Sequence, residues 1–258
     1  MKPRVAVFKF ASCDGCQMQF FNAEDELLKL AGQVDFVYFP EARSRALEGP
    51  YDIAFVEGSI TTPDDARRII KVREDSRFLI TIGACATAGG VQALRNWADV
   101  EQYRRIVYPS PEFISTLSTS TPISEHVRVD FEVWGCPVDK HQLLAVVRSL
   151  LSKAQPALPA HSVCMECKRR GNVCVVITRG EPCLGPVTRT GCGALCPAFD
   201  RGCYGCFGPA DDQNMESLVR LLASQGFTGD DAMRRLRGIN GYVRPWRETA
   251  DAIAAGKK

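Results

Sequence analysis

Eight cysteines lie within the 43 residues from Cys164 to Cys206, and this run limits the possible folds of the chain more than any other feature. Such a density of thiols requires either cross-links or bound metal. The surrounding residues 164–209 hold eight glycines and four prolines and show little hydrophobic periodicity. A segment of this composition cannot build an apolar core by itself, so we expect metal binding and folding to be coupled there.

Three chemistries compete for these cysteines. Zinc suits the paired elements Cys164-Met-Glu-Cys167 and Cys203-Tyr-Gly-Cys206. Disulfides suit short secreted domains without a core, whereas the first 150 residues here carry enough Val, Ile, Leu and Phe to fold unaided. Iron–sulfur clusters suit the irregular spacing of the other cysteines and the Cys196-Pro197 dipeptide. The twelve cysteines of the whole chain would then form three sets of four, one set for each cubane.

Composition narrows the class of protein and its compartment. The chain has 258 residues, of which 45% are hydrophobic and 24% charged, and its formal net charge is +2. Without a strong basic excess, nucleic acid is not expected as a partner. No apolar stretch approaches the roughly 20 residues of a membrane span, and residues 5–8 are too short for the apolar core of a secretion signal. We therefore expect a cytoplasmic protein with no membrane span.

The first 155 residues alternate between strand and helix patterns. Runs rich in Val, Ile and Phe predict strands, and amphipathic patterns predict helices; the strands cover residues 4–10, 34–39, 51–57, 78–82 and 126–133, and the helices cover 17–30, 63–74 and 139–153. This alternation predicts the α/β class, with a flavodoxin-like parallel sheet that carries helices on both faces. The Ser/Thr-rich residues 116–124 predict a surface loop.

The alternation stops at a linker over residues 154–160, which contains two prolines. The chain is therefore expected to have two domains, an α/β domain over residues 1–155 and an iron–sulfur domain over 156–258. The second domain should have little regular structure in its cysteine-rich part and two helices near its end, over residues 215–225 and 230–237.

The four remaining cysteines each follow the end of a predicted strand. Cys13 and Cys16 follow the first strand, Cys85 follows the fourth and Cys136 the fifth. Ligands of open parallel sheets bind at the carboxyl ends of the strands, so three loops should bring four thiols to one rim. Cys13-x-x-Cys16 alone is also compatible with a thioredoxin-like redox motif.

Five motifs together resemble the small subunit of a [NiFe]-hydrogenase, in the order and spacing of that family and over nearly all of the chain up to Pro209. They are Ser12-Cys13-Asp14-Gly15-Cys16, Glu57-Gly58-Ser59-Ile60, residues 83–90, Gly135-Cys136-Pro137 and Cys183-Leu184-Gly185-Pro186-Val187-Thr188 with Cys192. Because no twin-arginine leader is present, the chain is similar to the cytoplasmic, cofactor-coupled group that includes sulfhydrogenase delta subunits. Members of that group exchange electrons with NAD(P), coenzyme F420 or a heterodisulfide reductase.

The resemblance implies ligands for three [4Fe-4S] clusters. The proximal set is Cys13, Cys16, Cys85 and Cys136; the medial set is Cys192, Cys196, Cys203 and Cys206; the distal set is Cys164, Cys167, Cys174 and Cys183. Cys164 stands where periplasmic members carry a histidine ligand, and Cys196 stands where they often have proline and a three-iron cluster. Both departures favour three clusters of four irons.

The resemblance also implies partners. A large subunit would carry the nickel–iron centre and dock over the proximal set, and a diaphorase subunit containing FAD would reduce NAD(P), together with an additional iron–sulfur subunit. The alternatives are an F420-reducing or heterodisulfide-reductase-linked hydrogenase, a complex I-type quinone oxidoreductase subunit, and a zinc scaffold. The complex I-type family usually has adjacent cysteines at the first ligand position and lacks the eight-cysteine run.

Glu57 ends a predicted strand close to the proximal set, and two interpretations of it are open. It would relay a proton or form a hydrogen bond at the interface with the large subunit, or it would serve as an ordinary turn residue or ion-pair partner. The sequence contains no P-loop and no Gly-x-Gly-x-x-Gly motif, so no nucleotide is expected on this chain despite the flavodoxin-like sheet.

Overall fold

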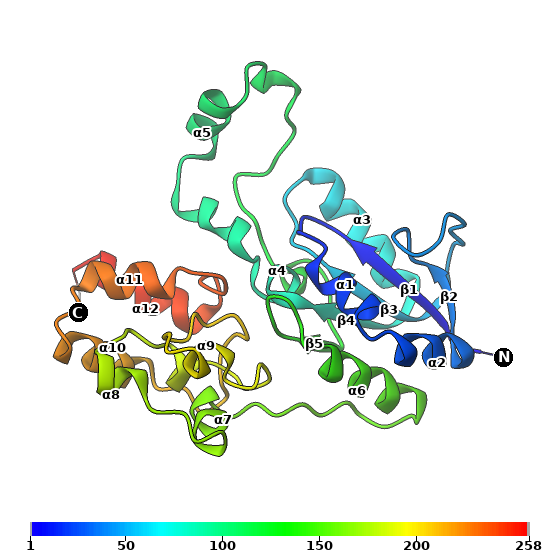
Figure 1. Cartoon of the computed structure of the whole chain (residues 1–258). Helices are drawn as coiled ribbons and strands as arrows, with labels where there is room; N and C mark the ends of the chain where they lie inside the picture. Colours follow the sequence, from blue (N-terminus) through cyan, green and yellow to red (C-terminus); the bar gives the residue numbers. More distant parts are fainter. Residues whose placement is uncertain (1, 257–258) are drawn as a thin grey trace. The chain divides into compact units, whose positions relative to one another are not determined.

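The computed structural model describes residues 2–256 and divides the chain into two compact units, residues 1–156 and 157–258. Each unit is described by itself (Figure 1). Within residues 2–256, no helix combines the length and the apolar character needed to cross a membrane.

The first unit is built on a five-stranded sheet in which every pairing is parallel. Its strands are β1 (Arg4–Lys9), β2 (Asp35–Tyr38), β3 (Tyr51–Glu57), β4 (Ser76–Ile82) and β5 (Phe131–Val133). They lie in the order β2-β1-β3-β4-β5, which is the flavodoxin-like order, with its topological switch point between β1 and β3. The predicted fold class is confirmed.

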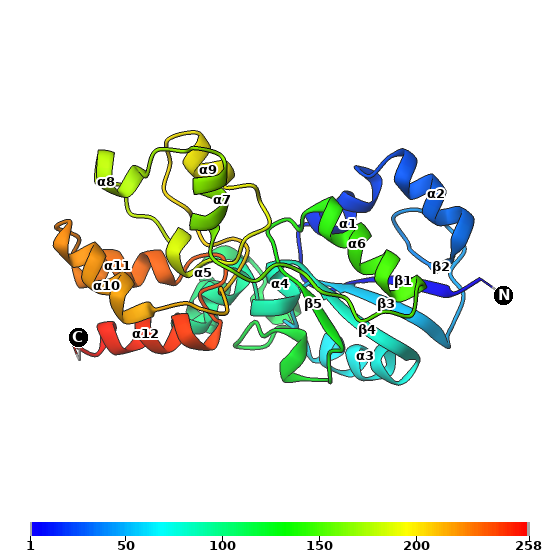
Figure 2. The ribbon, with the colours of Figure 1, turned by 90° about the horizontal axis from the view of Figure 1, so that it is seen from below.

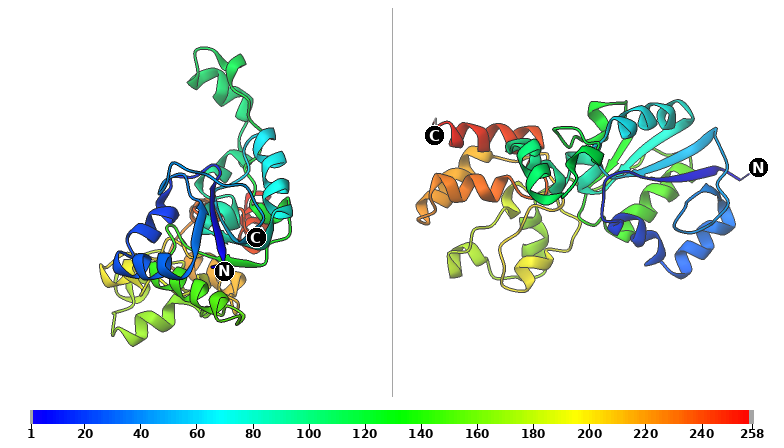
Figure 3. Two further views of the ribbon diagram at one scale, coloured as in Figure 1. Left: turned by 90° about the vertical axis from the view of Figure 1, so that its right-hand side faces the viewer. Right: turned by 90° about the horizontal axis from the view of Figure 1, so that it is seen from above.

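Helices cover both faces of this sheet. One face carries α1 (Gly15–Phe21), α2 (Asp25–Gln33) and α6 (Lys140–Leu151), and the other carries α3 (Pro63–Glu74) (Figures 2 and 3). The start of α3 follows from its sequence: the Thr62 side chain accepts a hydrogen bond from the Asp65 amide, Asp65 reciprocates, and Pro63 fits the first turn.

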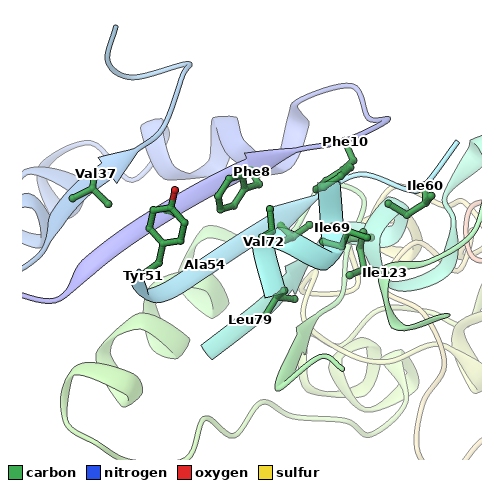
Figure 4. Close-up of a cluster of buried hydrophobic side chains, with 13 residues drawn as sticks. Phe8, Phe10, Val37, Tyr51, Ala54, Ile60, Ile69, Val72, Leu79 and Ile123 are labelled. Atoms are coloured by element: carbon green, nitrogen blue, oxygen red, sulfur yellow. The ribbon is translucent and has the colours of Figure 1, made fainter. Parts of the chain in front are cut away.

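A hydrophobic cluster fills the space between α3 and the sheet (Figure 4). Ile69 and Val72 of α3 are buried there against Phe8 and Phe10 of the β1 segment and Leu79 of β4. Full burial of each such side chain contributes about 1.5–3 kcal/mol. This layer fixes the ends of β1, β3 and β4 relative to one another, and with them the loops that follow.

Three local predictions for this unit are wrong. The helix expected over residues 17–30 is two helices, α1 and α2, because the chain breaks between them and Glu24 has a positive φ of 48°. The strand expected over residues 126–133 pairs only from Phe131. The loop over residues 116–124 is partly internal: Ser120 is fully buried, and Thr121 forms an antiparallel bridge with Ile60.

Between β4 and β5 the chain forms several short elements that the sequence did not predict. They are α4 (Gly83–Ala88), η1 (Val91–Trp97), α5 (Val100–Val107), η2 (Pro111–Phe113) and η3 (Ile123–Glu125). No residue of α5 is buried, and this helix lies away from the sheet of its own unit (Figure 1).

The second unit combines short helices around the cysteines with three longer helices. The elements are α7 (Val163–Arg169), α8 (Val175–Arg179), η4 (Gly185–Val187), α9 (Leu195–Ala198), α10 (Met215–Ser224), α11 (Gly229–Leu236) and α12 (Arg244–Ala254). The helix α12 was not predicted, although Pro245 in its first turn and the spacing of Trp246, Ala250 and Ile253 are helix signals.

Part of the cysteine-rich segment packs against the helices that follow it. Leu184 and Val187, which closely follow Cys183, are fully buried in a cluster with residues of α10, α11 and α12, including the fully buried Trp246. The expectation that this segment lacks a core overlooked the residues after 209, because these supply most of the apolar surface that covers it.

Candidate metal centres

The proximal set lies at the carboxyl ends of three strands of the first unit. Cys13 follows β1 and Cys16 is in the first turn of α1; Cys85 is in α4, directly after β4; Cys136 follows β5. The loop after β1 starts at the topological switch point, where open α/β sheets bind their ligands.

The four thiols of the proximal set are close enough to influence one another. Cys16 interacts electrostatically with Cys85 and Cys136, and Cys13 interacts with Cys85 and Cys136. Burial is the main cause that raises the pKa of Cys16 and Cys136, and it raises the pKa of Cys85 to about 11. Buried thiols of this kind ionise only when a positive centre compensates them, as a bound metal does.

Two glycines keep the space around these sulfurs open. Gly83 has φ +84°, and a Cβ placed on it would overlap the Cys16 sulfur. Gly90 has φ +64°, and its Cβ would lie 2.7 Å from the Cys85 sulfur. Soft thiolate donors from three loops, with glycines beside two of the sulfurs, fit an iron–sulfur cluster in this position.

Glu57 holds the loop that carries Cys13 and Cys16. It ends β3 with only 1% of its surface exposed, and its two carboxylate oxygens accept hydrogen bonds from the backbone amides of Cys16 and Gln17, each at 3.2 Å. These amides belong to the first turn of α1, where helix donors lack partners within the helix. Burial raises the pKa of Glu57, although the two amides oppose that shift.

Gln92 is a further polar contact of the proximal set that the sequence did not indicate. Its Nε2 donates to the carbonyl of Ala11 at 2.8 Å and lies 3.5 Å from the Cys85 sulfur. It thereby links the loop after β4 to the loop after β1. Because 81 residues separate Gln92 from Ala11, no local pattern could have shown this contact.

The distal set forms one group in the second unit. Cys164 interacts electrostatically with Cys167, Cys174 and Cys183, and Cys167 interacts with Cys174 and Cys183. Burial raises the pKa of Cys164 to about 11 and raises that of Cys167 and Cys183. The Cys183 sulfur accepts hydrogen bonds from the amides of Cys203 (3.2 Å) and Gly185 (3.4 Å).

The medial set lies in two pairs. Cys192 interacts with Cys196, and Cys203 interacts with Cys206. Burial raises the pKa of Cys192 and Cys203, and Cys203 is also in electrostatic contact with Cys183 of the distal set. The two cysteine sets of this unit are therefore neighbours.

Glu166, between two cysteines of the distal set, joins these neighbouring segments. One of its oxygens accepts from the amide of Gly191 at 3.2 Å and the other from the amide of Ala194 at 3.1 Å, so its carboxylate holds the backbone on both sides of Cys192. The first unit uses Glu57 in the same way. Sequence reasoning missed this role because the partners are 25 and 28 residues away.

All twelve cysteines are free thiols in the structure. Within residues 2–256, no three His, Cys, Asp or Glu side chains converge closely enough to hold a single metal ion. A cubane cluster binds its four thiolates through four separate irons and needs no such convergence.

The fold and the thiol sets thus define an iron–sulfur protein with a flavodoxin-like first domain, and comparison with known proteins gives its family. Residues 13–150 match the family model of the NADH ubiquinone oxidoreductase 20 kDa subunit. This match includes the proximal set and ends before Cys164.

Proteins similar over the whole chain are hydrogenase subunits. The delta subunit of sulfhydrogenase 2 from Pyrococcus furiosus is 34% identical over 91% of this chain and 98% of its own length. A subunit of the F420-non-reducing hydrogenase from Methanocaldococcus jannaschii is 30% identical, with 94% of this chain and 95% of that protein covered. A crystal structure of an NAD+-reducing [NiFe]-hydrogenase contains a chain 31% identical to this one, with a TM-score of 0.58, covering 62% of this chain and 96% of that chain.

The chain belongs to the family of [NiFe]-hydrogenase small subunits. It is an electron-transfer, iron–sulfur subunit of a hydrogenase, an oxidoreductase complex. The resemblance seen in the sequence motifs is confirmed.

Proposed function

We propose that this subunit relays electrons through three [4Fe-4S] clusters, held by the proximal, medial and distal sets, between a nickel–iron site on the large subunit and a flavin-containing partner. The grouping of the thiols supports this proposal most directly, since the distal cysteines are all in mutual electrostatic contact and lie beside the medial ones. Each cluster, once bound, accepts and releases one electron at a time.

The chain itself positions and shields the clusters. Glu57 holds the first turn of α1, in which Cys16 lies. Gly83 and Gly90 leave room at the sulfurs. In the second unit, amides donate to the sulfurs of Cys183 and Cys203, and hydrogen bonds of this kind tune cluster potentials.

We assign the final acceptor to NAD(P), reduced by a diaphorase subunit that contains FAD and is accompanied by an additional iron–sulfur subunit. This is supported by the similarity to a subunit of an NAD+-reducing enzyme. Because relatives named F420-non-reducing hydrogenase are of comparable identity, transfer to a heterodisulfide reductase is the second candidate. The cytoplasmic location expected from the sequence stays a prediction.

A proton relay through Glu57 at the interface with the large subunit remains part of the proposal. The test is Glu57→Gln in the assembled hydrogenase, with hydrogen isotope exchange and the proximal electron paramagnetic resonance (EPR) signal both measured. A relay predicts that exchange falls more than the proximal signal does. A role confined to holding the α1 turn predicts that exchange and signal fall in parallel.

The cluster proposal is tested by metal analysis of this subunit after its separation from the other subunits of the purified complex. Three cubanes require about twelve irons and about twelve labile sulfides in this subunit; zinc with little iron would refute the proposal. In the variant Cys196→Ser the medial set should lose its four-iron cluster. Met165→Ser is the matched control, because Met165 is an exposed neighbour of Cys164 and not a proposed ligand. Copurification with a diaphorase or with a heterodisulfide reductase decides the acceptor.

A further inference from the structure

Gln92 places a side-chain amide between the loops that carry Cys13 and Cys85. Its Nε2 donates to the carbonyl of Ala11 at 2.8 Å and lies 3.5 Å from the Cys85 sulfur. Its Oε1 lies 3.5 Å from the same sulfur. A Cβ on Gly90 would lie 2.6 Å from this Oε1 and 2.7 Å from the sulfur, so a glycine at that position keeps the contact open.

The carbonyl of Ala11 fixes the direction in which this amide faces. A carbonyl oxygen can only accept hydrogen bonds, so the amide atom beside it must be the donor Nε2. Nε2 carries two hydrogens, and the one that Ala11 does not use is available to the Cys85 sulfur. A free thiol can donate to Oε1, whereas a thiolate has no hydrogen and can only accept from Nε2. The amide therefore suits both states of the sulfur without turning.

A buried polar network holds the Ala11 carbonyl in turn. This carbonyl accepts from the Ser59 amide at 3.0 Å, and the Ser59 Oγ lies 2.9 Å from the Ser120 Oγ. Both serines are fully buried. The Asn96 side chain exchanges two hydrogen bonds with the backbone of Ser120, at 2.8 and 2.9 Å. Buried networks with satisfied members are rigid, so the acceptor that orients the amide is held in place.

We propose that Gln92 is a positioning residue of the proximal set, which donates a hydrogen bond to the Cys85 thiolate and thereby raises the reduction potential of the cluster bound there. The inference rests on the proposed three-cluster function. Reduction adds one electron to the cluster and its thiolates, with no bond formed or broken, and a donor directed at sulfur stabilises the added negative charge. Residues 1–156 contain only the four cysteines of the proximal set, so the effect belongs to this cluster.

The test is a redox titration of the purified hydrogenase complex followed by EPR spectroscopy, in which the proximal midpoint is the one that Cys16→Ser removes or shifts. Gln92→Met keeps the length of the side chain and removes its polar atoms. It should move the proximal midpoint to a more negative value and leave the other midpoints and the iron content unchanged. After incubation in D2O, the proximal signal should also lose one deuteron coupling in pulsed EPR.

Gln102→Met is the matched control. It makes the same substitution in the same connection between β4 and β5, at an exposed position, and should change neither the midpoint nor the couplings.

The outcomes separate the inference from the function on which it rests. At full iron content, a proximal midpoint that stays or rises in Gln92→Met would overturn the inference. A lower midpoint with every deuteron coupling retained would also overturn it, since the donor would then lie elsewhere. Zinc with little iron in the unmodified subunit would instead overturn the proposed function.

A second variant covers the case in which Gln92→Met loses iron. Gln92→Glu then replaces it, because a carboxylate keeps the shape of the side chain and has no hydrogen to donate. Its proximal midpoint should likewise be more negative, and an unchanged midpoint would contradict the inference. Loss of iron from both variants would show a role in assembly and overturn the inference.

Discussion

The carboxylate of Glu57 accepts a hydrogen bond from the backbone amide of Cys16 across 41 residues of sequence. The end of β3 is thereby tied to the start of α1, and the turn that carries two cysteines of the proximal set is fixed by an element that carries none. Glu166 does the same for the loop around Cys192. In each unit, a carboxylate accepts hydrogen bonds from the backbone of a segment that carries cysteines: Glu57 at Cys16 and Glu166 around Cys192.

Replacing Glu57 should therefore affect stability as well as cluster binding. Glu57→Ala leaves two buried amides without an acceptor, at about 1–3 kcal/mol each, so thermal unfolding of the subunit should shift downward and the proximal EPR signal should weaken. Glu57→Gln keeps one acceptor oxygen, so its unfolding temperature and its EPR signal should lie between those of Glu57→Ala and the wild type. The exposed Glu74→Gln is the control. Equal stability of Glu57→Ala and wild type would contradict the holding role.

Gly83→Ala should remove the proximal cluster. A residue with a side chain at a left-handed position costs about 1–2 kcal/mol, and overlap of the new Cβ with the Cys16 sulfur adds a packing cost of about 1–3 kcal/mol. Gly226→Ala measures the first effect alone, because Gly226 has nearly the same φ (+85°) and nothing within 4 Å of its Cβ position; the difference between the two variants gives the second effect. Iron analysis should show a loss for Gly83→Ala alone. Full iron content in this variant would show that the glycine is not needed at the sulfur.

Cys167→Ser and Cys16→Ser should separate the two ends of the electron path. Loss of the distal cluster in Cys167→Ser should abolish most hydrogen-dependent reduction of the acceptor and leave hydrogen isotope exchange at the large subunit largely intact. Cys16→Ser should impair both activities. If Cys167→Ser loses exchange as completely as acceptor reduction, either Cys167 does not belong to the outermost cluster or that cluster is needed for assembly.

Asp130 makes a pH-dependent contribution to the sheet. Burial of the Asp130 carboxyl tends to raise its pKa, but the Leu79 amide (2.8 Å) and Arg73 outweigh this and lower the pKa. A lowered pKa means that the stabilisation is complete above the unfolded-state pKa of about 3.9 and is lost as the pH falls through the folded-state pKa. Asp130→Asn should thus lower the Tm by about 2–4 °C, corresponding to about 1 kcal/mol.

That difference in Tm should be constant from pH 5 to pH 8, because the titration lies below this range. Thermal unfolding at several pH values measures it. Asp64→Asn is the control, since Asp64 forms an exposed ion pair with Arg67 and such pairs contribute little. A difference that changes between pH 5 and pH 8 would rule out this origin of the stabilisation.

The sequence predicted those parts of the structure that depend on local pattern. The parallel sheet and the positions of Cys13, Cys85 and Cys136 after its strands follow from alternating hydrophobic runs and turn residues. The break at Glu24 had only Asn22 as a local turn signal, because neither Gly nor Pro occurs between residues 22 and 24. The contacts of Glu57, Glu166 and Gln92 join segments 25 or more residues apart, and only the packed fold shows them.

The burial of Leu184 bears on what happens to the subunit when it loses a cluster. It follows Cys183 directly and is fully buried among α10, α11 and α12, so the backbone that presents this sulfur is anchored by apolar packing that contains no iron. On the three-cluster proposal, a subunit that loses the cluster on the distal set should keep this anchor. Fresh iron and sulfide should then restore the cluster without synthesis of a new chain.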